Sequence, residues 1–248
     1  TMMPGNYCFP FQFTLDNHLP GTFTLNTEHG SSTDARVRYE CRAEVQVPGI
    51  FESNLKHYQD ILICQPLKNG LMAIDTYKET KVTFLCCIPK GTVSLAATID
   101  KNAYAPGENV MLHLIVDNSK SQVDLSSFKF HLTQDITLYA GGQSKSMSRV
   151  IVTSRCDGVS KGDRIDRNMA VQLPVHCEPS TDGYLVKCKY TLVVELSVPW
   201  SPNVRVIQPV QVYAPIMANY SAQLLLPNNW QPTVMPVVNL NAMQYQSF

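Results

Sequence analysis

Two strands joined by a proline–glycine turn constrain the fold of this chain more than any other feature. Hydrophobic residues alternate with polar or small ones on both sides of the turn, at Val93, Leu95, Ala97 and Ile99 before it and at Val110, Leu112, Leu114 and Val116 after it. A period of two is typical of a β-strand with one buried face. Pro106 presets φ in the turn, Gly107 is free to adopt a positive φ, and Asp117-Asn118-Ser119 ends the second strand. The pattern predicts a β-hairpin-like unit of an antiparallel sandwich.

The same alternation recurs along the chain, most cleanly from Val37 to Val47, where apolar and charged or polar residues exchange at every position. Strand and turn signals repeat about every 8–12 residues, which is typical of an all-β sandwich. Further strands are expected at Phe9–Leu15, Val82–Ile88, Phe128–Leu132, Arg149–Thr153, Asn168–Leu173, Tyr184–Val198, Val204–Ile207 and Val210–Val212. We expect turns at Pro89–Gly91 and at 140–144, and a loop at Cys156–Lys161. Residues 51–61 leave a helical turn and a strand-like loop both open.

Composition excludes several classes of function. Apolar residues make up 44% of the 248 residues, which is enough for a packed core, and 20 basic residues balance 20 acidic ones. Nucleic acid binding needs a basic surplus or a dense basic face, so we expect no nucleic acid partner. No apolar run reaches the length that spans a bilayer, and the first residues do not form a signal peptide, so we expect no transmembrane segment.

The cysteines indicate a compartment. They are Cys8, Cys41, Cys64, Cys86, Cys87, Cys156, Cys177 and Cys188. Their even number invites a disulfide interpretation, but Cys41 lies on the apolar phase of a strand and the adjacent Cys86 and Cys87 do not easily bridge each other. Without a secretory signal, we expect reduced, partly buried thiols in a cytosolic protein. The sequon at Asn219 is the opposing signal.

Three passages carry a family resemblance. Tyr104, Pro106, Gly107 and Glu108, followed by an aliphatic strand and by Asn118-Ser119, resemble the opening of the C-terminal domain of arrestin-fold proteins. Within that fold the chain is most similar to the α-arrestin (arrestin domain-containing) branch. Residues 5–15 and 19–23, followed by a strand centred on Tyr39, resemble a segment from the middle of the family's N-terminal domain. Leu173-Pro174 and then Tyr184–Val198 resemble the penultimate strands of its C-terminal domain. The resemblance extends loosely over residues 4–215.

The resemblance implies two immunoglobulin-like β-sandwich domains, of which the N-terminal one is incomplete. Residues 1–90 would form the partial N-terminal sandwich, residues 91–215 the C-terminal sandwich, and residues 216–248 an extended or disordered tail. Family members carry several strands before the segment at residues 5–15, and here only four residues precede it. We therefore expect a fragment or an incomplete gene product. The alternative is a dimer or bound partner that covers the exposed face of the half-sandwich, because soluble monomers rarely expose such faces. That face would carry Phe9, Phe11, Phe13, Val37 and Tyr39.

Signatures of catalysis and of metal binding are missing from the sequence. It contains no C-x-x-C, no H-E-x-x-H, no phosphate-binding glycine loop and no G-x-S-x-G elbow. Cys86-Cys87 and His176-Cys177 are better explained as structural residues than as a nucleophile or a metal site. His113 and His131 fall on the outward phase of strands, and the acidic and basic residues of 157–167 are typical of a solvated loop. We expect no enzyme activity, no cofactor and no metal.

The resemblance implies a non-enzymatic adaptor or scaffold that binds cytoplasmic tails of membrane proteins in endocytic trafficking or signalling. Ubiquitin ligases or trafficking proteins are the further partners it implies, and the cytoplasm, with peripheral sites at endosomes or the plasma membrane, is the location. The Pro-Pro-x-Tyr motif through which many α-arrestins recruit ligases does not occur in residues 216–248. Two alternatives stay open: an arrestin-fold subunit of a retromer-like sorting complex, and a secreted β-sandwich binding module.

The partner-binding residues cannot be assigned from the sequence. Exposure and composition favour residues 155–168 and the tail after Pro215 as the interaction surface. Tyr104, Pro106, Gly107, Glu108, Asn118 and Ser119 are expected to be structural. Self-association through the incomplete N-terminal sandwich is a further expectation.

Overall fold

The structure is a computed structural model and describes residues 9, 11, 13–16, 18–25, 34–47, 53–67, 70–84 and 87–213. Every helix or strand in these residues is a β-strand, so the all-β prediction is confirmed. Within the same residues, no helix could cross a membrane. The chain divides into two compact units, one at Pro20–Pro215 and another that combines residues 1–19 with 216–248, and the strands of the described residues lie in the first.

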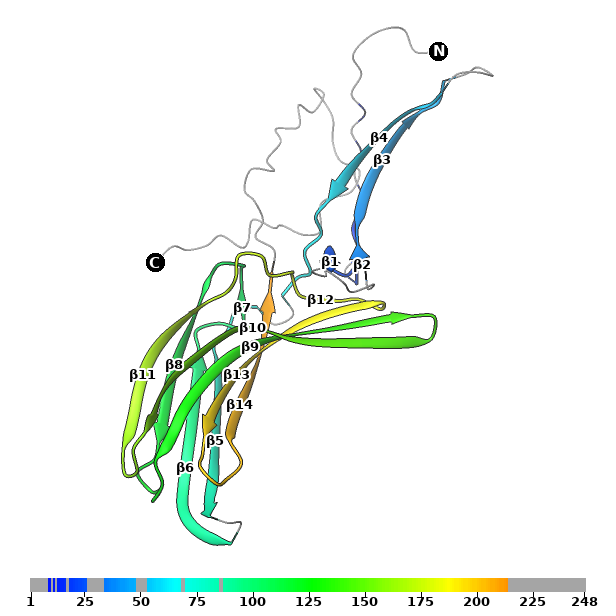
Figure 1. Cartoon of the computed structure of the whole chain (residues 1–248). Helices are drawn as coiled ribbons and strands as arrows, with labels where there is room; N and C mark the ends of the chain where they lie inside the picture. Colours follow the sequence, from blue (N-terminus) through cyan, green and yellow to red (C-terminus); the bar gives the residue numbers. More distant parts are fainter. Residues whose placement is uncertain are drawn as a thin grey trace. The chain divides into compact units, whose positions relative to one another are not determined.

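The strands follow one another along the chain as drawn in Figure 1. They are β1 (Phe23–Leu25), β2 (Ala35–Val37), β3 (Tyr39–Val45), β4 (Leu55–Ile61), β5 (Ile74–Phe84), β6 (Ile88–Ile99), β7 (Ala103–Tyr104), β8 (Asn109–Asp117), β9 (Leu125–Ala140), β10 (Gln143–Val159), β11 (Arg164–Gln172), β12 (Thr181–Asp182), β13 (Val186–Ser197) and β14 (Val204–Val212).

Two sheets form the principal sandwich. One has the order β10-β9-β13-β14-β7, with β12 beside β13, and the other has the order β11-β8-β6-β5. Neighbouring strands are antiparallel except for the short parallel contact between β14 and β7. Side chains that alternate inward from both sheets, such as Leu95, Leu114, Leu132 and Val194, are at most 2% exposed and form one apolar core. β5 pairs with β6 in the second of these sheets, although it precedes the domain boundary predicted near residue 90.

A buried glutamine ties the two sheets together. Gln208 interrupts the inward apolar phase of β14 and is completely buried. Its amide nitrogen is within hydrogen-bond distance of the carbonyl oxygens of Ile74 (3.0 Å) and Ala97 (2.8 Å) and of the Thr76 hydroxyl (2.8 Å). Because a buried amide needs such partners, Gln208 fixes the position of β14 over β5 and β6.

The hairpin-like unit predicted from the alternation is confirmed. β6 and β8 pair antiparallel, from Ser94 opposite Asp117 to Ile99 opposite Leu112. The eight alternating apolar residues of the two strands are each at most 1% exposed. The short strand β7 lies in the connection between them and joins the opposite sheet. The unit therefore belongs to both sheets of the sandwich.

The first strands form two separate two-stranded sheets, β1–β2 and β3–β4. The continuous strand predicted at Val37–Val47 is divided at Arg38, and Val45 is 53% exposed. Residues 55–61 form β4, so this part of the open stretch at 51–61 is a strand. The amide N–H of Thr22 donates to the Ile63 carbonyl at 2.8 Å, which connects the segment before β1 with the segment after β4.

Several predictions of local structure are wrong. The strand expected at Phe9–Leu15 is one of them, because none of its described residues lies in a strand. The expected loop at Cys156–Lys161 is strand up to Val159, and the strand expected to begin at Asn168 begins at Arg164. Gly158 favoured the loop interpretation, because glycine usually weakens a strand. In the structure, glycine is required within the strand, because a Cβ at this position would lie 1.6 Å from the Leu125 carbonyl oxygen.

Two further errors concern the stretch from Val82 to Gly91. The continuous strand expected at Val82–Ile88 reverses direction, so that Phe84 and Ile88 face each other, and the turn expected at Pro89–Gly91 lies inside β6. A β-bulge between Val82 and Thr83 accompanies the positive φ of Gly91, +105°, which the alternation does not reveal. The tail at 216–248, the sequon at Asn219, Cys8 and Cys86 lie outside the described residues.

Candidate interaction surface

The residues of the proline–glycine turn are brought together, and their contacts are structural. The Glu108 carboxylate accepts a hydrogen bond from the Ala105 N–H at 2.8 Å and pairs with the Lys101 ammonium. The Glu108 carbonyl accepts a hydrogen bond from Leu173 N–H at 2.9 Å, just after β11. Gly107 has φ of +80°, as expected for this turn, and a Cβ there would lie 3.1 Å from Val175. The turn fixes the end of β11 against the start of β8.

Tyr104 anchors the same turn from inside the sandwich. Its side chain is completely buried, and its hydroxyl donates to the Asp100 carboxylate at 2.7 Å. Burial, together with that hydrogen bond, raises the pKa of Tyr104 above its ordinary value. The phenol is therefore a neutral structural donor at physiological pH.

Asn118 and Ser119 lie at the other end of β8, about 30 Å from the turn for a nine-residue strand. Asn118 is fully buried, and its amide nitrogen is 2.9 Å from the carbonyl oxygens of Val123 and Ser160 and 3.2 Å from that of Val159. The side chain thus joins the loop after β8 to the end of β10. Ser119 donates to Asp117 at the surface.

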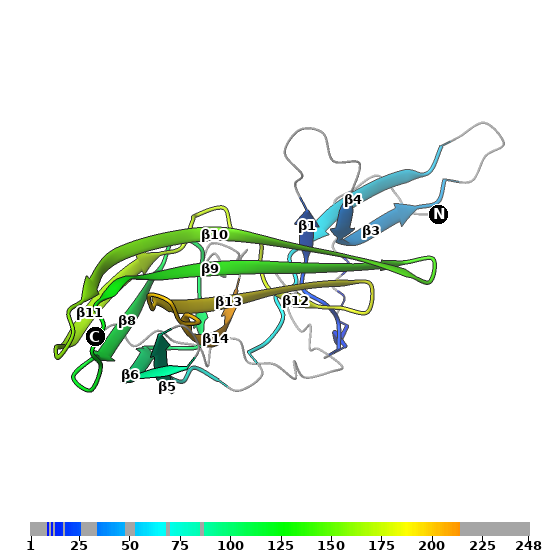
Figure 2. The same ribbon diagram turned by 60° about the horizontal axis from the view of Figure 1, so that its bottom comes forward.

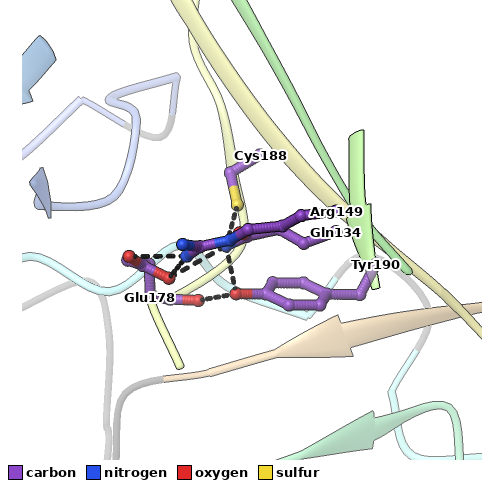
Figure 3. A network of polar contacts seen from close by, with 5 residues as sticks. All are labelled: Gln134, Arg149, Glu178, Cys188 and Tyr190. Carbon is purple, nitrogen blue, oxygen red and sulfur yellow. Dashed lines mark hydrogen bonds and ion pairs between the residues drawn. The ribbon is translucent and has the colours of Figure 1, made fainter. Parts of the chain in front are cut away.

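A polar network occupies the inner face of the six-stranded sheet (Figure 3). Gln134, in β9, is completely buried and donates to Tyr190 at 2.6 Å and to Glu178 at 3.0 Å. Arg149, in β10, makes a two-point contact with the Glu178 carboxylate at 2.9 and 2.7 Å, and also donates to Gln134. Tyr190 donates to the Glu178 carbonyl at 2.6 Å. The network holds the segment after β11 against β9, β10 and β13.

This segment also contacts the residues just before β1 and just after β4. The hydroxyl of Thr181, which is buried, donates to the Gly21 carbonyl at 3.4 Å, and the Asp182 N–H donates to the Gln65 side chain at 2.8 Å. Because Glu178 lies only a few residues upstream, the network in Figure 3 positions the residues that make these contacts. The network therefore holds Thr181 and Asp182 in place for their contacts with Gly21 and Gln65.

The buried thiols next to this network are poorly suited to nucleophilic chemistry. Burial raises the pKa of Cys177 to about 11 and that of Cys188 to about 12. A nucleophilic cysteine requires a lowered pKa. The described residues also contain no group of three or more His, Cys, Asp and Glu side chains that could hold a metal ion. His113 pairs with Asp166 at 2.7 Å on the outer face of β8 and β11.

The outer face of the six-stranded sheet has a shallow hollow. It is lined by Lys129, His131, Val150, Thr153, Val193, Glu195, Arg205 and Ile207. The Glu195 side chain is 3% exposed and is bound by Lys129 at 3.0 Å, by Asn203 at 2.8 Å and by Arg205. Burial opposes its ionisation, but these hydrogen bonds outweigh burial and hold the pKa of Glu195 below its ordinary value. Val150 and Ile207 are 58% and 59% exposed, so the hollow combines cations with accessible aliphatic surface.

The strand β10 borders this hollow at the edge of the sheet (Figure 2). The surface predicted at residues 155–168 includes its last residues, the turn that follows, and the first half of β11. The assignment of 155–168 as partner-binding stays a prediction, and the tail after Pro215 lies outside the described residues. The sequence did not indicate the polar network or the hollow. A signal was present, because Gln134 and Gln208 both stand at core positions of apolar strands.

Comparison with known proteins supports the resemblance. The family model for the arrestin (or S-antigen) C-terminal domain matches residues 89–216. Arrestin domain-containing protein A of Dictyostelium discoideum is 27% identical over 220 residues, covering 87% of this chain and 36% of that protein. Human arrestin domain-containing protein 4 is 21% identical, covering 85% of this chain and 49% of that protein. Thioredoxin-interacting protein of Sus scrofa is 26% identical, covering 82% of this chain and 51% of that protein.

The chain thus spans about half or less of the length of these curated relatives. The matched residues include both sheets of the sandwich except β5, together with the turn at Tyr104–Glu108 and the Asn118 anchor. With just over half of its residues matched by the family model and with arrestin domain-containing proteins among its relatives, the chain belongs to the arrestin family and is of the α-arrestin type.

Proposed function

We propose that this chain acts as a non-enzymatic adaptor or scaffold that binds cytoplasmic parts of membrane proteins in endocytic trafficking or signalling. The observation that carries the proposal is the match of residues 89–216 to the arrestin C-terminal domain, together with the arrestin domain-containing relatives. The proposed location is the cytoplasm, with peripheral sites at endosomes or the plasma membrane. Trafficking proteins and ubiquitin ligases are the further partners proposed.

The structure supports a mechanism based on surface contacts. The buried polar residues Tyr104, Asn118, Gln134 and Gln208 are hydrogen-bonded within the sandwich and make its loops and sheets rigid. A rigid sandwich offers sheet edges and outer faces in a fixed geometry, and extended peptides bind such edges by strand addition. Partners would therefore bind as an added strand or against the outer face.

A binding panel tests the proposal. The purified chain is presented with immobilised cytoplasmic segments of receptors and transporters and, as matched controls, extracellular segments of the same proteins. Selective and saturable binding to a subset of the cytoplasmic segments is expected. Equal binding to both kinds of segment, or binding to neither, contradicts the adaptor role.

A further inference from the structure

β10 presents a long unpaired edge. This strand has 17 residues and pairs with β9 from Gln143 to Val159, with a shift in register between Val150 and Val152. It is the terminal strand of its sheet, and no other strand of the described residues pairs with its second edge. Figure 2 shows β10 as the outermost strand, with β9 and β13 on one side only. An edge of this kind exposes backbone N–H and C=O groups that can pair with another extended chain.

The charge of β10 distinguishes it from the other long edge strands. It carries three cations, Lys145, Arg149 and Arg155, against one carboxylate, Asp157. By contrast, β5 carries two cations and two carboxylates, and β11 carries two cations and one carboxylate. Among the edges of the sandwich that the structure describes, β10 therefore has the highest formal net charge, although Arg149 is paired with Glu178.

Arg155 and Lys129 lie directly opposite each other across β10 and β9. Like charges in this arrangement destabilise a pair of strands. Lys129 is paired with Glu195, whereas Arg155 is exposed and makes no ion pair with a carboxylate of the described residues. The edge thus holds an unmatched positive charge that a negatively charged partner would stabilise.

Apolar surface lies beside this charge. Val150 and Thr153 of β10 line the hollow, which continues to Val193 and Ile207 on β13 and β14. A strand added to β10 would place alternate side chains on this outer face. An aliphatic side chain of the added strand would contact Val150, and an acidic one would meet Arg155.

We propose that the free edge of β10 binds an extended acidic peptide of a partner protein by antiparallel or parallel strand addition, with a Glu or Asp side chain at Arg155 and an aliphatic side chain at Val150. The inference deepens the proposed adaptor role and rests on it for the kind of partner. A second copy of this chain is a poor occupant, because pairing two β10 edges brings together two strands with three cations each.

The test uses the purified full chain and two acetylated, fluorescent ten-residue peptides. In one, glutamate alternates with valine and threonine; in the other, lysine replaces every glutamate. Fluorescence anisotropy is expected to show at least tenfold tighter binding of the glutamate peptide, weakening as salt rises. Hydrogen exchange is expected to slow at backbone amides of residues 143–157, which distinguishes strand addition from contacts made by side chains alone.

Arg155→Glu is expected to weaken binding of the glutamate peptide at least tenfold. Arg164→Glu, on the edge strand β11 of the other sheet, is the matched control and is expected to change it less than twofold. Thermal unfolding of both variants, compared with wild type, shows that each is folded. Equal binding of the two peptides, equal effects of the two substitutions, or protection confined to β5 or β11 overturns the proposal. If Arg155→Glu strengthens self-association of the chain, a second copy is the occupant of the β10 edge, and this result also overturns the proposal.

The two proposals fail in different ways. If the glutamate peptide does not bind at β10 but membrane-protein segments still bind the chain, the adaptor uses another surface and only this inference is lost. If the peptide binds at β10 while no membrane-protein segment does, the edge is real and the adaptor role is contradicted.

Discussion

Removal of the Asn118 side chain should destabilise the sandwich strongly for a single polar residue. The amide nitrogen of Asn118 reaches three carbonyl oxygens, of Val123, Val159 and Ser160, at 2.9–3.2 Å, and the residue is fully buried. Asn118→Ala removes this donor from all three carbonyl groups, of which the Ser160 carbonyl keeps a hydrogen bond from the Asp163 N–H. At about 1–3 kcal/mol for each buried group left unsatisfied, and with two N–H donors lost, the free energy of unfolding should fall by about 2–6 kcal/mol.

Differential scanning calorimetry measures this effect. A loss near 3 kcal/mol lowers Tm by roughly 6–12 °C, at about 2–4 °C per kcal/mol for a domain of about 150–250 residues. Ser119→Ala is the matched control, because the Ser119 hydroxyl bonds only to Asp117 in a solvent-exposed hydrogen bond, and the free energy of unfolding should fall by less than about 1 kcal/mol. A Tm for Asn118→Ala within about 2 °C of wild type, or equal losses for the two variants, would refute the reasoning.

Asn118→Asp adds a test that depends on pH. Burial and the surrounding carbonyl oxygens raise the pKa of the introduced carboxyl above the unfolded value of about 3.9. Its protonated form can donate one hydrogen bond, so the variant is most stable below that value and loses stability as pH rises through the raised folded pKa. We expect Asn118→Asp to be less stable than Asn118→Ala at pH 7 and the difference to shrink at pH 4. A difference that does not vary with pH argues against a buried carboxyl at this position.

Three further predictions follow from individual contacts. Gly158→Ala should lower the free energy of unfolding by more than about 3 kcal/mol, because a Cβ would lie 1.6 Å from the Leu125 carbonyl oxygen. Gly141→Ala should lower it by about 1 kcal/mol, because residue 141 has a φ of +57° but no atom within 4 Å of the added Cβ. Similar Tm values for the two variants would contradict the close approach at Gly158. Glu195→Gln should cost about 1 kcal/mol at pH 7, since its cationic partners are partly solvated. Because the pKa of Glu195 is lowered in the folded state, the wild type should lose this stabilisation as pH falls below about 4.3 and through the folded pKa, whereas the variant should not. Parallel acid unfolding curves for the wild type and the variant would disprove this role of Glu195. Alkylation at pH 8, followed by mass spectrometry, should show the exposed Cys87 modified long before Cys188, because a pKa of about 12 leaves about one Cys188 side chain in 10⁴ as thiolate. Equal rates of modification would show that Cys188 is not buried.

The strands that alternate strictly were predictable from sequence, because one buried face imposes a period of two. This holds for β6 and β8, where every apolar position of the pattern is buried. It fails for β10, where Gly158 and a series of serines and cations resemble a loop although the strand continues to Val159. An edge strand needs apolar residues on one face at most, so its pattern is weak.

The polar network was not predictable for a different reason. Arg149 and Glu178 are 29 positions apart, and no local pattern indicates that a segment after β11 returns to β10. Gln134 and Gln208 nonetheless occupy core positions of β9 and β14. A polar residue at a core position requires buried partners, so both could have been identified as network residues, although not the partners themselves.

Isolation of the endogenous protein under mild cross-linking tests the adaptor role most directly. Partners are identified by mass spectrometry and compared with those of a parallel isolation without cross-linker. We expect membrane receptors or transporters, cross-linked through their cytoplasmic segments and largely lost when the cross-linker is omitted. A fixed set of partners at constant stoichiometry that persists without cross-linker and contains no membrane protein would contradict the adaptor role and indicate a subunit of a stable sorting complex.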